Sequence, residues 1–82
     1  MTLLAPALEH LVKGIVDHPD EVRVSAKNSP RGDVLEVRVH PEDLGRVIGR
    51  AGRTAKALRT LVAALADGRR VRVDVVDTDR RR

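Results

Sequence analysis

The spacing of apolar residues changes several times along this 82-residue chain. Between positions 4 and 16 leucines, isoleucine and valines recur at intervals of three and four, which is typical of one face of an α-helix. Later segments alternate apolar and polar residues, as half-buried strands do. In chain order the pattern predicts a helix beginning near residues 3–5 and ending before His18, strands over 22–26 and 34–39, a short helix over 41–48, a longer helix over 53–67 and a strand over 71–75.

Prolines and glycines mark the boundaries between these segments. His18-Pro19-Asp20 stops the first helix, because a residue before proline disfavours the helical region. Residues 28–33 have the composition of a turn between two paired strands. Pro41 suits the first position of a helix, and Gly68 suits the position just after the end of one. The order helix, strand, strand, helix, turn, helix, strand predicts an α+β fold, in which three helices pack on one face of a three-stranded sheet.

The longer helix has two faces of different character. With about 100° per residue and Arg53 at zero, one arc from about 80° to 200° is apolar and the arc from about 240° to 360° is basic. The predicted core positions on the apolar arc are Ala55, Leu58, Leu61, Val62 and Leu65. Val47 and Ile48, at the end of the short helix, are expected in the core; the alternative is that they line a ligand groove, and Val47 could do both.

Composition limits what the chain can be. Its length suits one domain, which we expect over residues 1–77, followed by a charged, disordered tail at 78–82. There is no cysteine, no apolar run of membrane-spanning length and no signal-peptide pattern, so a cytoplasmic protein without membrane contact is expected. His10, His18 and His40 look isolated, and no catalytic set or metal-ligand spacing appears. We therefore expect neither an enzyme nor a cofactor, metal or small-molecule substrate.

The net charge of +4 is concentrated in one part of the chain. Residues 42–70 carry seven basic and three acidic side chains, a surplus of four, whereas residues 1–41 carry five and six. A basic patch of this kind attracts polyanions with a strong dependence on salt. A solvated basic helix face has the same composition, so charge alone does not identify a ligand.

Two glycines stand at the centre of the basic segment. Gly49 and Gly52 have the spacing G-x-x-G, and no acidic residue lies between Arg46 and Leu65. A glycine turn that opens a helix combines backbone freedom, unpaired amides and a positive dipole end, which together favour phosphate. The candidate phosphate-binding residues are Arg46, Gly49, Arg50, Ala51, Gly52, Arg53, Lys56 and Arg59.

Each of these residues has an expected role. Gly49 closes the short helix with a positive φ, and Gly52 lets the backbone approach a phosphate. Arg50 pairs with phosphate beside the small Ala51. Arg53 and Lys56 contact successive phosphates, with Arg46 and Arg59 at the margins. The structural alternative is that both glycines are ordinary helix caps.

The segment Val47-Ile-Gly-Arg-Ala-Gly-Arg-Thr-Ala-Lys-Ala-Leu-Arg59 resembles the signature loop of KH domains, and is most similar to the KhpA family of small bacterial single-KH proteins. The similarity extends to Pro41-Glu-Asp-Leu-Gly45 and to His18-Pro-Asp-Glu-Val22. It implies a type II KH fold of order α-β-β-α-α-β whose G-x-x-G loop binds single-stranded RNA. It also implies a KhpB (Jag/EloR)-type RNA-binding partner, homodimers that meet near this loop, and a role as post-transcriptional regulator or RNA chaperone connected with cell shape.

Other readings of the same residues are weaker or remain open. The P-loop pattern G-x-x-x-x-G-K-[ST] is not present, and a helix-turn-helix normally sits in a helical bundle without strands. Folds that stack bases on aromatic rings are excluded, because the chain has no Phe, Tyr or Trp. Two classes of function remain: an RNA-binding module, and a protein-interaction subunit whose basic face docks an acidic partner.

Overall fold

The computed structural model describes residues 4–76, and its elements follow the predicted order. The helices are α1 (Leu4–Lys13), α2 (Leu44–Ile48) and α3 (Arg53–Ala66), and the strands are β1 (Arg23–Ser29), β2 (Gly32–Arg38) and β3 (Val71–Val75). Short 3-10 turns, η1 (Pro19–Glu21), η2 (Pro41–Asp43) and η3 (Arg50–Gly52), precede β1, α2 and α3. The tail predicted at 78–82 lies outside the described residues. None of the helices within residues 4–76 is long and apolar enough to cross a membrane.

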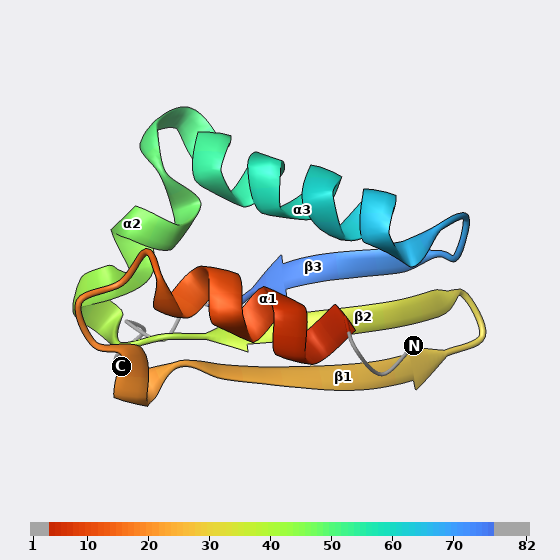
Figure 1. Cartoon of the computed structure of the whole chain (residues 1–82), viewed down its shortest axis with the longest axis horizontal. Helices are drawn as coiled ribbons and strands as arrows, with labels where there is room; N and C mark the ends of the chain where they lie inside the picture. The colour runs from red at the N-terminus through yellow and green to blue at the C-terminus, as the bar shows by residue number, and fades with distance from the viewer. Residues whose placement is uncertain (1–3, 77–82) are drawn as a thin grey trace.

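The three strands form one mixed sheet in the order β1-β2-β3. β1 and β2 are an antiparallel hairpin, whereas β3 lies parallel to β2, with Leu35 opposite Val73. The parallel pair requires a long crossover, which α2, η3 and α3 supply. Figure 1 shows α1 lying across the sheet and α3 running along β3, and α1 and α3 also contact each other. The predicted α+β class and the order α-β-β-α-α-β are confirmed.

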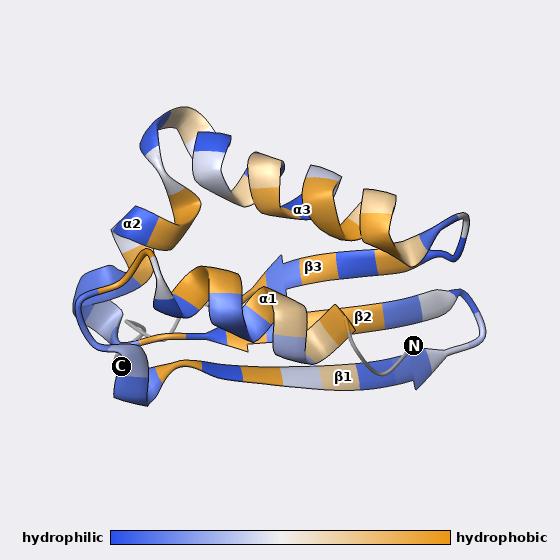
Figure 2. Ribbon diagram, in the orientation of Figure 1, coloured by the Kyte–Doolittle hydropathy of each residue, from blue (hydrophilic) through white to orange (hydrophobic). Residues whose placement is uncertain are grey.

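The core is built entirely from aliphatic side chains between the helices and the sheet. Alternate residues of β2 point inward, as strand geometry requires, and meet the apolar stripes of α1 and α3. The largest fully buried hydrophobic residues are Leu8, Val12, Val22, Val37, Val47 and Val62. Figure 2 shows the matching colour pattern on the ribbon, with apolar and polar positions alternating along the strands. This core supports α2, and the polar groups described below lie at the two ends of that helix.

α1 is shorter than its apolar pattern predicts. The helix ends at Lys13, and the amide of Gly14 is shared between the carbonyls of His10 (3.3 Å) and Leu11 (3.2 Å). Glycine is a poor helix residue, and this bifurcated geometry is common where helices end. Val16 is nevertheless buried, so the apolar pattern correctly identified a core residue but not the last turn of the helix.

The buried arc of α3 is centred further around the helix than the apolar pattern predicts. Ala55, Leu58 and Val62 are buried as expected, and Ala66 joins them. Their positions span about 140° to 220° at about 100° per residue. Leu61 and Leu65 lie outside this arc and are 40% and 52% exposed, so their assignment to the core was wrong.

Ile48 at the end of α2 was also wrongly assigned to the core. Its side chain is 39% exposed, whereas that of Val47 is completely buried. A helix of five residues can direct only one side of its single turn toward the core, and Val47 occupies that side. α2 therefore ends with an apolar residue facing solvent, beside the glycine turn.

Candidate nucleic-acid interface

The segment between α2 and α3 is a tight turn in which three of the four residues at 49–52 have a positive φ. Gly49 ends α2 with φ 79° and ψ 168°, Ala51 lies at φ 57° and ψ 26°, and Gly52 at φ 76° and ψ 13°. The amide of Gly49 donates to the Gly45 carbonyl (2.8 Å), and that of Gly52 to the Gly49 carbonyl (3.0 Å). A positive φ is costly for residues with a Cβ, so the turn favours glycine at 49 and 52, while Ala51 bears this cost itself.

The two glycines are required for different reasons. A Cβ on Gly49 would collide with Thr54, approaching the Thr54 amide nitrogen and Cβ to 2.7 Å and also its Oγ1. A Cβ on Gly52 would meet no atom within 4 Å. Gly49 therefore allows α2 and the first turn of α3 to come together. Gly52 supplies a positive φ and leaves open space above the backbone, as its predicted role in approaching a phosphate requires.

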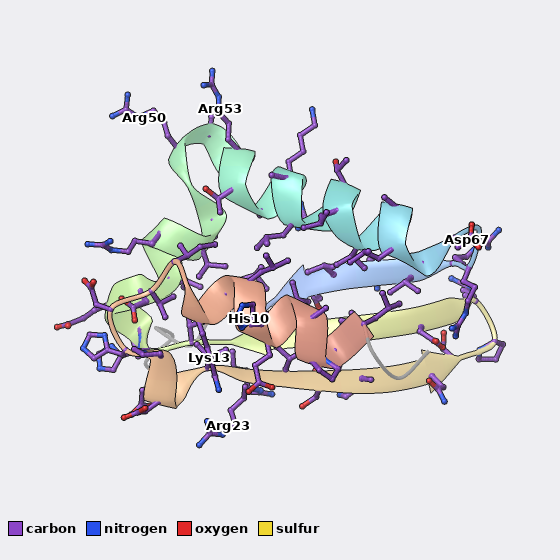
Figure 3. The ribbon with its side chains drawn as sticks, in the orientation of Figure 1. His10, Lys13, Arg23, Arg50, Arg53 and Asp67 are labelled. Atoms are coloured by element: carbon purple, nitrogen blue, oxygen red, sulfur yellow. The ribbon has the colours of Figure 1, made fainter. Side chains whose placement is uncertain are left out.

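Three of the predicted basic residues gather at this turn with free charges. Arg50, Arg53 and Lys56 are exposed, and none of them has an ion pair or side-chain hydrogen bond with any residue in the range 4–76. Figure 3 shows Arg50 and Arg53 extending from the turn away from the body of the domain. Within the described chain, the amides of Arg50 and Ala51 also have no hydrogen-bond acceptor. Exposed cationic side chains and amides without a described acceptor are thus found within the same short stretch of chain.

The other two predicted basic residues have partners. Arg46 pairs with Asp17, with 3.1 Å between Nη2 and Oδ2, and both side chains are more than half exposed. Arg59 turns toward the sheet, where its Nε donates to the carbonyl oxygen of Val73 (3.3 Å). Among the described residues, Arg50, Arg53 and Lys56 therefore lie unpaired at the turn. Arg46 and Arg59, before and after them in the chain, each have a partner.

A polar junction at the other end of α2 was missed by sequence reasoning. Asp43 is 1% exposed and accepts three hydrogen bonds, from the amides of Asp17 (3.2 Å) and His18 (2.9 Å) and from Nδ1 of His18 (2.9 Å). The His18 ring also stacks on that of His40, with centroids 3.9 Å apart and 12° between planes. The prediction that these two histidines are isolated was therefore wrong. The only available signal was that each of them precedes a proline.

The junction changes the acidity of both partners. The hydrogen bond to Asp43 raises the pKa of His18 above its ordinary value, against the opposing effect of desolvation. Burial acts to raise the pKa of Asp43, but the hydrogen bonds from the His18 ring and from the amides of Asp17 and His18 outweigh it, so this pKa is lowered. Both shifts favour the ion pair.

His18, His40 and Glu42 are close enough to suggest a metal site, but their arrangement does not fit one. Their ligand atoms lie within 4.8 Å of one another. The two imidazole rings are nearly parallel, however, and a metal ion should lie in the plane of each ring that binds it. Nδ1 of His40 also accepts a hydrogen bond from the Glu42 amide (3.0 Å). In this arrangement the three residues stabilise the entry to α2 instead.

Comparison with known proteins places the chain in a family. The model of the KhpA/KhpB KH domain matches residues 6–76. The RNA-binding protein KhpA of Leifsonia xyli subsp. xyli is 87% identical over 75 residues, covering 92% of this chain and 99% of the relative. The protein of the same name from Streptomyces coelicolor is 69% identical over 77 residues, covering 94% and 96%. The one from Halalkalibacterium halodurans is 51% identical over 72 residues, covering 85% and 95%. No solved structure matches. The fold, the glycine turn and these relatives agree, and the chain belongs to the KhpA/KhpB family of KH domains.

Proposed function

We propose that this chain is not an enzyme but an RNA-binding protein, which holds single-stranded RNA with the turn at 49–52 and the basic face of α3. The observation that supports this most directly is the open space at Gly52. No atom would lie within 4 Å of a Cβ there, and Arg50 and Arg53 extend outward from the same turn (Figure 3). The relatives are named RNA-binding proteins, which agrees with this reading.

The chemistry of the turn suits a phosphate group better than a base. The amides of Arg50 and Ala51 and the N-terminal end of α3 supply donors and a positive dipole end to an anion. Guanidinium groups add charge-assisted, bidentate hydrogen bonds to phosphate oxygens. Because the chain has no aromatic residue on which bases can stack, each domain binds RNA weakly. Binding depends mainly on charge, so its affinity falls steeply as salt rises.

The double variant Arg50→Asp/Ala51→Asp tests this proposal. It reverses the charge of the turn without large backbone cost, because aspartate tolerates a left-handed conformation better than alanine does. We expect crosslinking to single-stranded RNA to be lost while the melting temperature stays close to that of the wild type. The matched control is Asn28→Asp/Arg31→Asp, which makes the same charge change at exposed positions of the β1–β2 hairpin.

A salt titration separates this proposal from the protein-docking alternative. We expect the logarithm of the wild-type affinity for RNA to fall linearly with the logarithm of salt concentration, by about 0.7 for each phosphate neutralised. A slope near zero, or RNA crosslinking that persists in the double variant, would remove the turn from RNA binding. The basic face would then be assigned to an acidic protein partner.

We further propose that the domain acts together with a second RNA-binding module, as a post-transcriptional regulator or RNA chaperone. The supporting observation is a shallow apolar hollow on the outer side of α3, lined by Ala57, Leu61 and Ala64 and bordered by Arg53 and Lys56. A partner seated here would bring its own RNA contacts next to the turn, and two weak sites joined in this way bind far more tightly than one. A KhpB-type protein or a second copy of the chain would fill this role, and sedimentation of the two proteins together and apart distinguishes these two partners.

A further inference from the structure

A second group of unpaired arginines lies far from the glycine turn. Figure 1 shows the tip of the β1–β2 hairpin and the chain that leads into β3 at one end of the long axis, with the turn toward the other end. The hairpin and the start of β3 border a hollow of about 340 Å³, called here the hairpin hollow. It is lined by Ser29 and residues 31–34 of the hairpin and by residues 70–72. None of these residues belongs to the turn or to α3.

The hairpin and the start of β3 come close together because residue 32 is a glycine. The Asp33 amide donates to the Arg70 carbonyl oxygen at 2.9 Å. Gly32 has a φ of 126°, and a Cβ built on it would lie 2.6 Å from that oxygen, 2.8 Å from Cγ of Arg70 and 2.9 Å from its Cβ. The alkyl part of Arg70 therefore occupies the space that a side chain at position 32 would need. Gly32 thus brings the Arg70 side chain against the hairpin.

Arg72 lies on the face of the sheet that the helices leave uncovered. Val34 of β2 is opposite Arg72 of β3, whereas the next pair along the strands, Leu35 and Val73, is buried in the core. Because successive strand residues point to opposite faces, Arg72 points away from the core. Arg31 reaches the same hollow from the hairpin tip. Arginines from two distant segments of the chain therefore line one small space.

The charge of these arginines is not balanced within the part of the chain that the structure describes. Arg31, Arg70 and Arg72 are exposed, and no side-chain hydrogen bond or ion pair joins any of them to a residue in the range 4–76. Asp33 also lines the hollow, but its Oδ2 accepts a hydrogen bond from Arg69 Nη2 at 3.1 Å. Like charges gathered around one space repel one another, and a bound anion removes that repulsion.

We propose that the hairpin hollow binds the polyphosphate group of a small molecule, supplied by inorganic triphosphate or by a nucleotide. Guanidinium groups form bidentate, charge-assisted hydrogen bonds with phosphate oxygens. A triphosphate concentrates several negative charges within a few bonds, whereas an RNA strand carries one charge per nucleotide. Three arginines around one hollow suit the concentrated charge better. The volume of the hollow is at the lower end of the range for small-molecule sites, which is about 300–1,000 Å³.

An NMR titration with sodium triphosphate tests this site in the full-length variant Arg50→Asp/Ala51→Asp, whose turn no longer offers a competing phosphate site. We expect the amide signals of residues 31–34 and 70–72 to shift and to saturate. Orthophosphate at matched ionic strength should bind about tenfold more weakly or less, because it offers fewer charges and acceptors. ATP distinguishes the two sources. Tighter binding than triphosphate assigns the site to a nucleotide, and equal or weaker binding shows that only the phosphate chain is recognised.

The variant Arg72→Gln separates a defined site from general attraction. It removes one guanidinium group from the hollow and should weaken triphosphate binding by about fivefold or more. The matched control Arg38→Gln makes the same change at an exposed residue of β2 that does not line the hollow, so binding should change by less than about twofold. Circular dichroism melting verifies that both variants are folded. Asn28→Asp/Arg31→Asp should likewise lose triphosphate binding while it crosslinks to RNA like the wild type.

Three results would overturn the inference without affecting RNA binding at the turn. The first is the absence of a saturable shift at residues 31–34 and 70–72. The second is an equal loss of triphosphate affinity in Arg72→Gln and Arg38→Gln, which would mean that only the overall charge matters. The third is a uridine octamer that shifts the same signals in the turn variant as strongly as triphosphate does, because the hollow would then be a second RNA surface.

Discussion

The two ends of α2 handle their polar groups in opposite ways. At the start of the helix, the junction around Asp43 is closed: its carboxylate is 1% exposed and accepts three hydrogen bonds. At the end, the turn at 49–52 is open, with exposed cations and amides that no described group satisfies. Satisfied buried polar groups stabilise a fold, whereas unsatisfied donors at the surface are free to bind a ligand. The five residues of α2 thus separate a closed, hydrogen-bonded region from the open turn that we propose binds RNA.

The largest effect should come from removing the carboxylate of the closed region. In Asp43→Ala the amides of Asp17 and His18 lose their acceptor inside the protein, and unpaired buried donors are expensive. We expect the melting temperature to fall by about 10 °C or more, measured by circular dichroism. RNA affinity at low temperature, where the variant is folded, should stay within about threefold of the wild type. A stable variant with greatly reduced RNA affinity would show that the two regions are not separate.

Substituting alanine for each of the two glycines separates effects on stability from effects on RNA binding within the turn. Gly49→Ala forces Thr54 to move and strains a positive φ, so it should destabilise the domain by about 2–3 kcal/mol. Gly52→Ala meets no neighbour and should cost about 1 kcal/mol, the ordinary penalty of a left-handed residue. Its new methyl group instead fills the space proposed for phosphate, so RNA affinity should fall by about tenfold. Denaturant unfolding and RNA titration of both variants measure this difference.

The proposed division would be wrong if the two glycines exchanged roles. A Gly52→Ala variant that unfolds easily and binds RNA normally when folded would mean that Gly52 is only a helix cap. Thr54→Ala is a useful companion, because it removes Oγ1 from the space beside Gly49. It should reduce the cost of Gly49→Ala without altering that of Gly52→Ala.

The smallest effect should be the pH dependence of the junction. The pKa of His18 is raised in the folded chain, so its stabilising contribution is complete below the unfolded value of 6.5 and is lost as pH rises through the folded value. The melting temperature should therefore decrease by a few degrees between about pH 6 and pH 8. His18→Asn should flatten this dependence. RNA binding by Arg50 and Arg53 should not change over this range, because arginine stays charged.

The stabilising contribution of Asp43 depends on pH in the opposite direction, and over a lower pH range. Its pKa is lowered by the hydrogen bonds that it accepts, so its contribution is present above the unfolded value of 3.8 and is lost as pH falls through the lower folded value. Acid unfolding should therefore begin below about pH 4. A melting temperature that rises between pH 6 and pH 8 would contradict the assigned hydrogen bond between His18 and Asp43.

The sequence by itself determined the order of elements, the aliphatic core and the glycine turn, because these depend on local properties. Apolar spacing set the helix and strand types, and Gly49 and Gly52 marked a bend that few other residues allow. The turn and its free cations Arg50 and Arg53 lie where the sequence predicts them. Their role in RNA binding stays a prediction.

Only the tertiary structure decided which residues meet across long stretches of chain. His18 and Asp43 are 25 residues apart, and no local pattern indicates that the loop after α1 packs on the start of α2. The contact of Arg59 with Val73 likewise depends on how α3 is rotated on the sheet, and the exposure of Leu61 follows from the same rotation. The spacing of apolar residues predicts that a helix has an apolar side. The neighbours packed against that helix determine which of its apolar residues are covered.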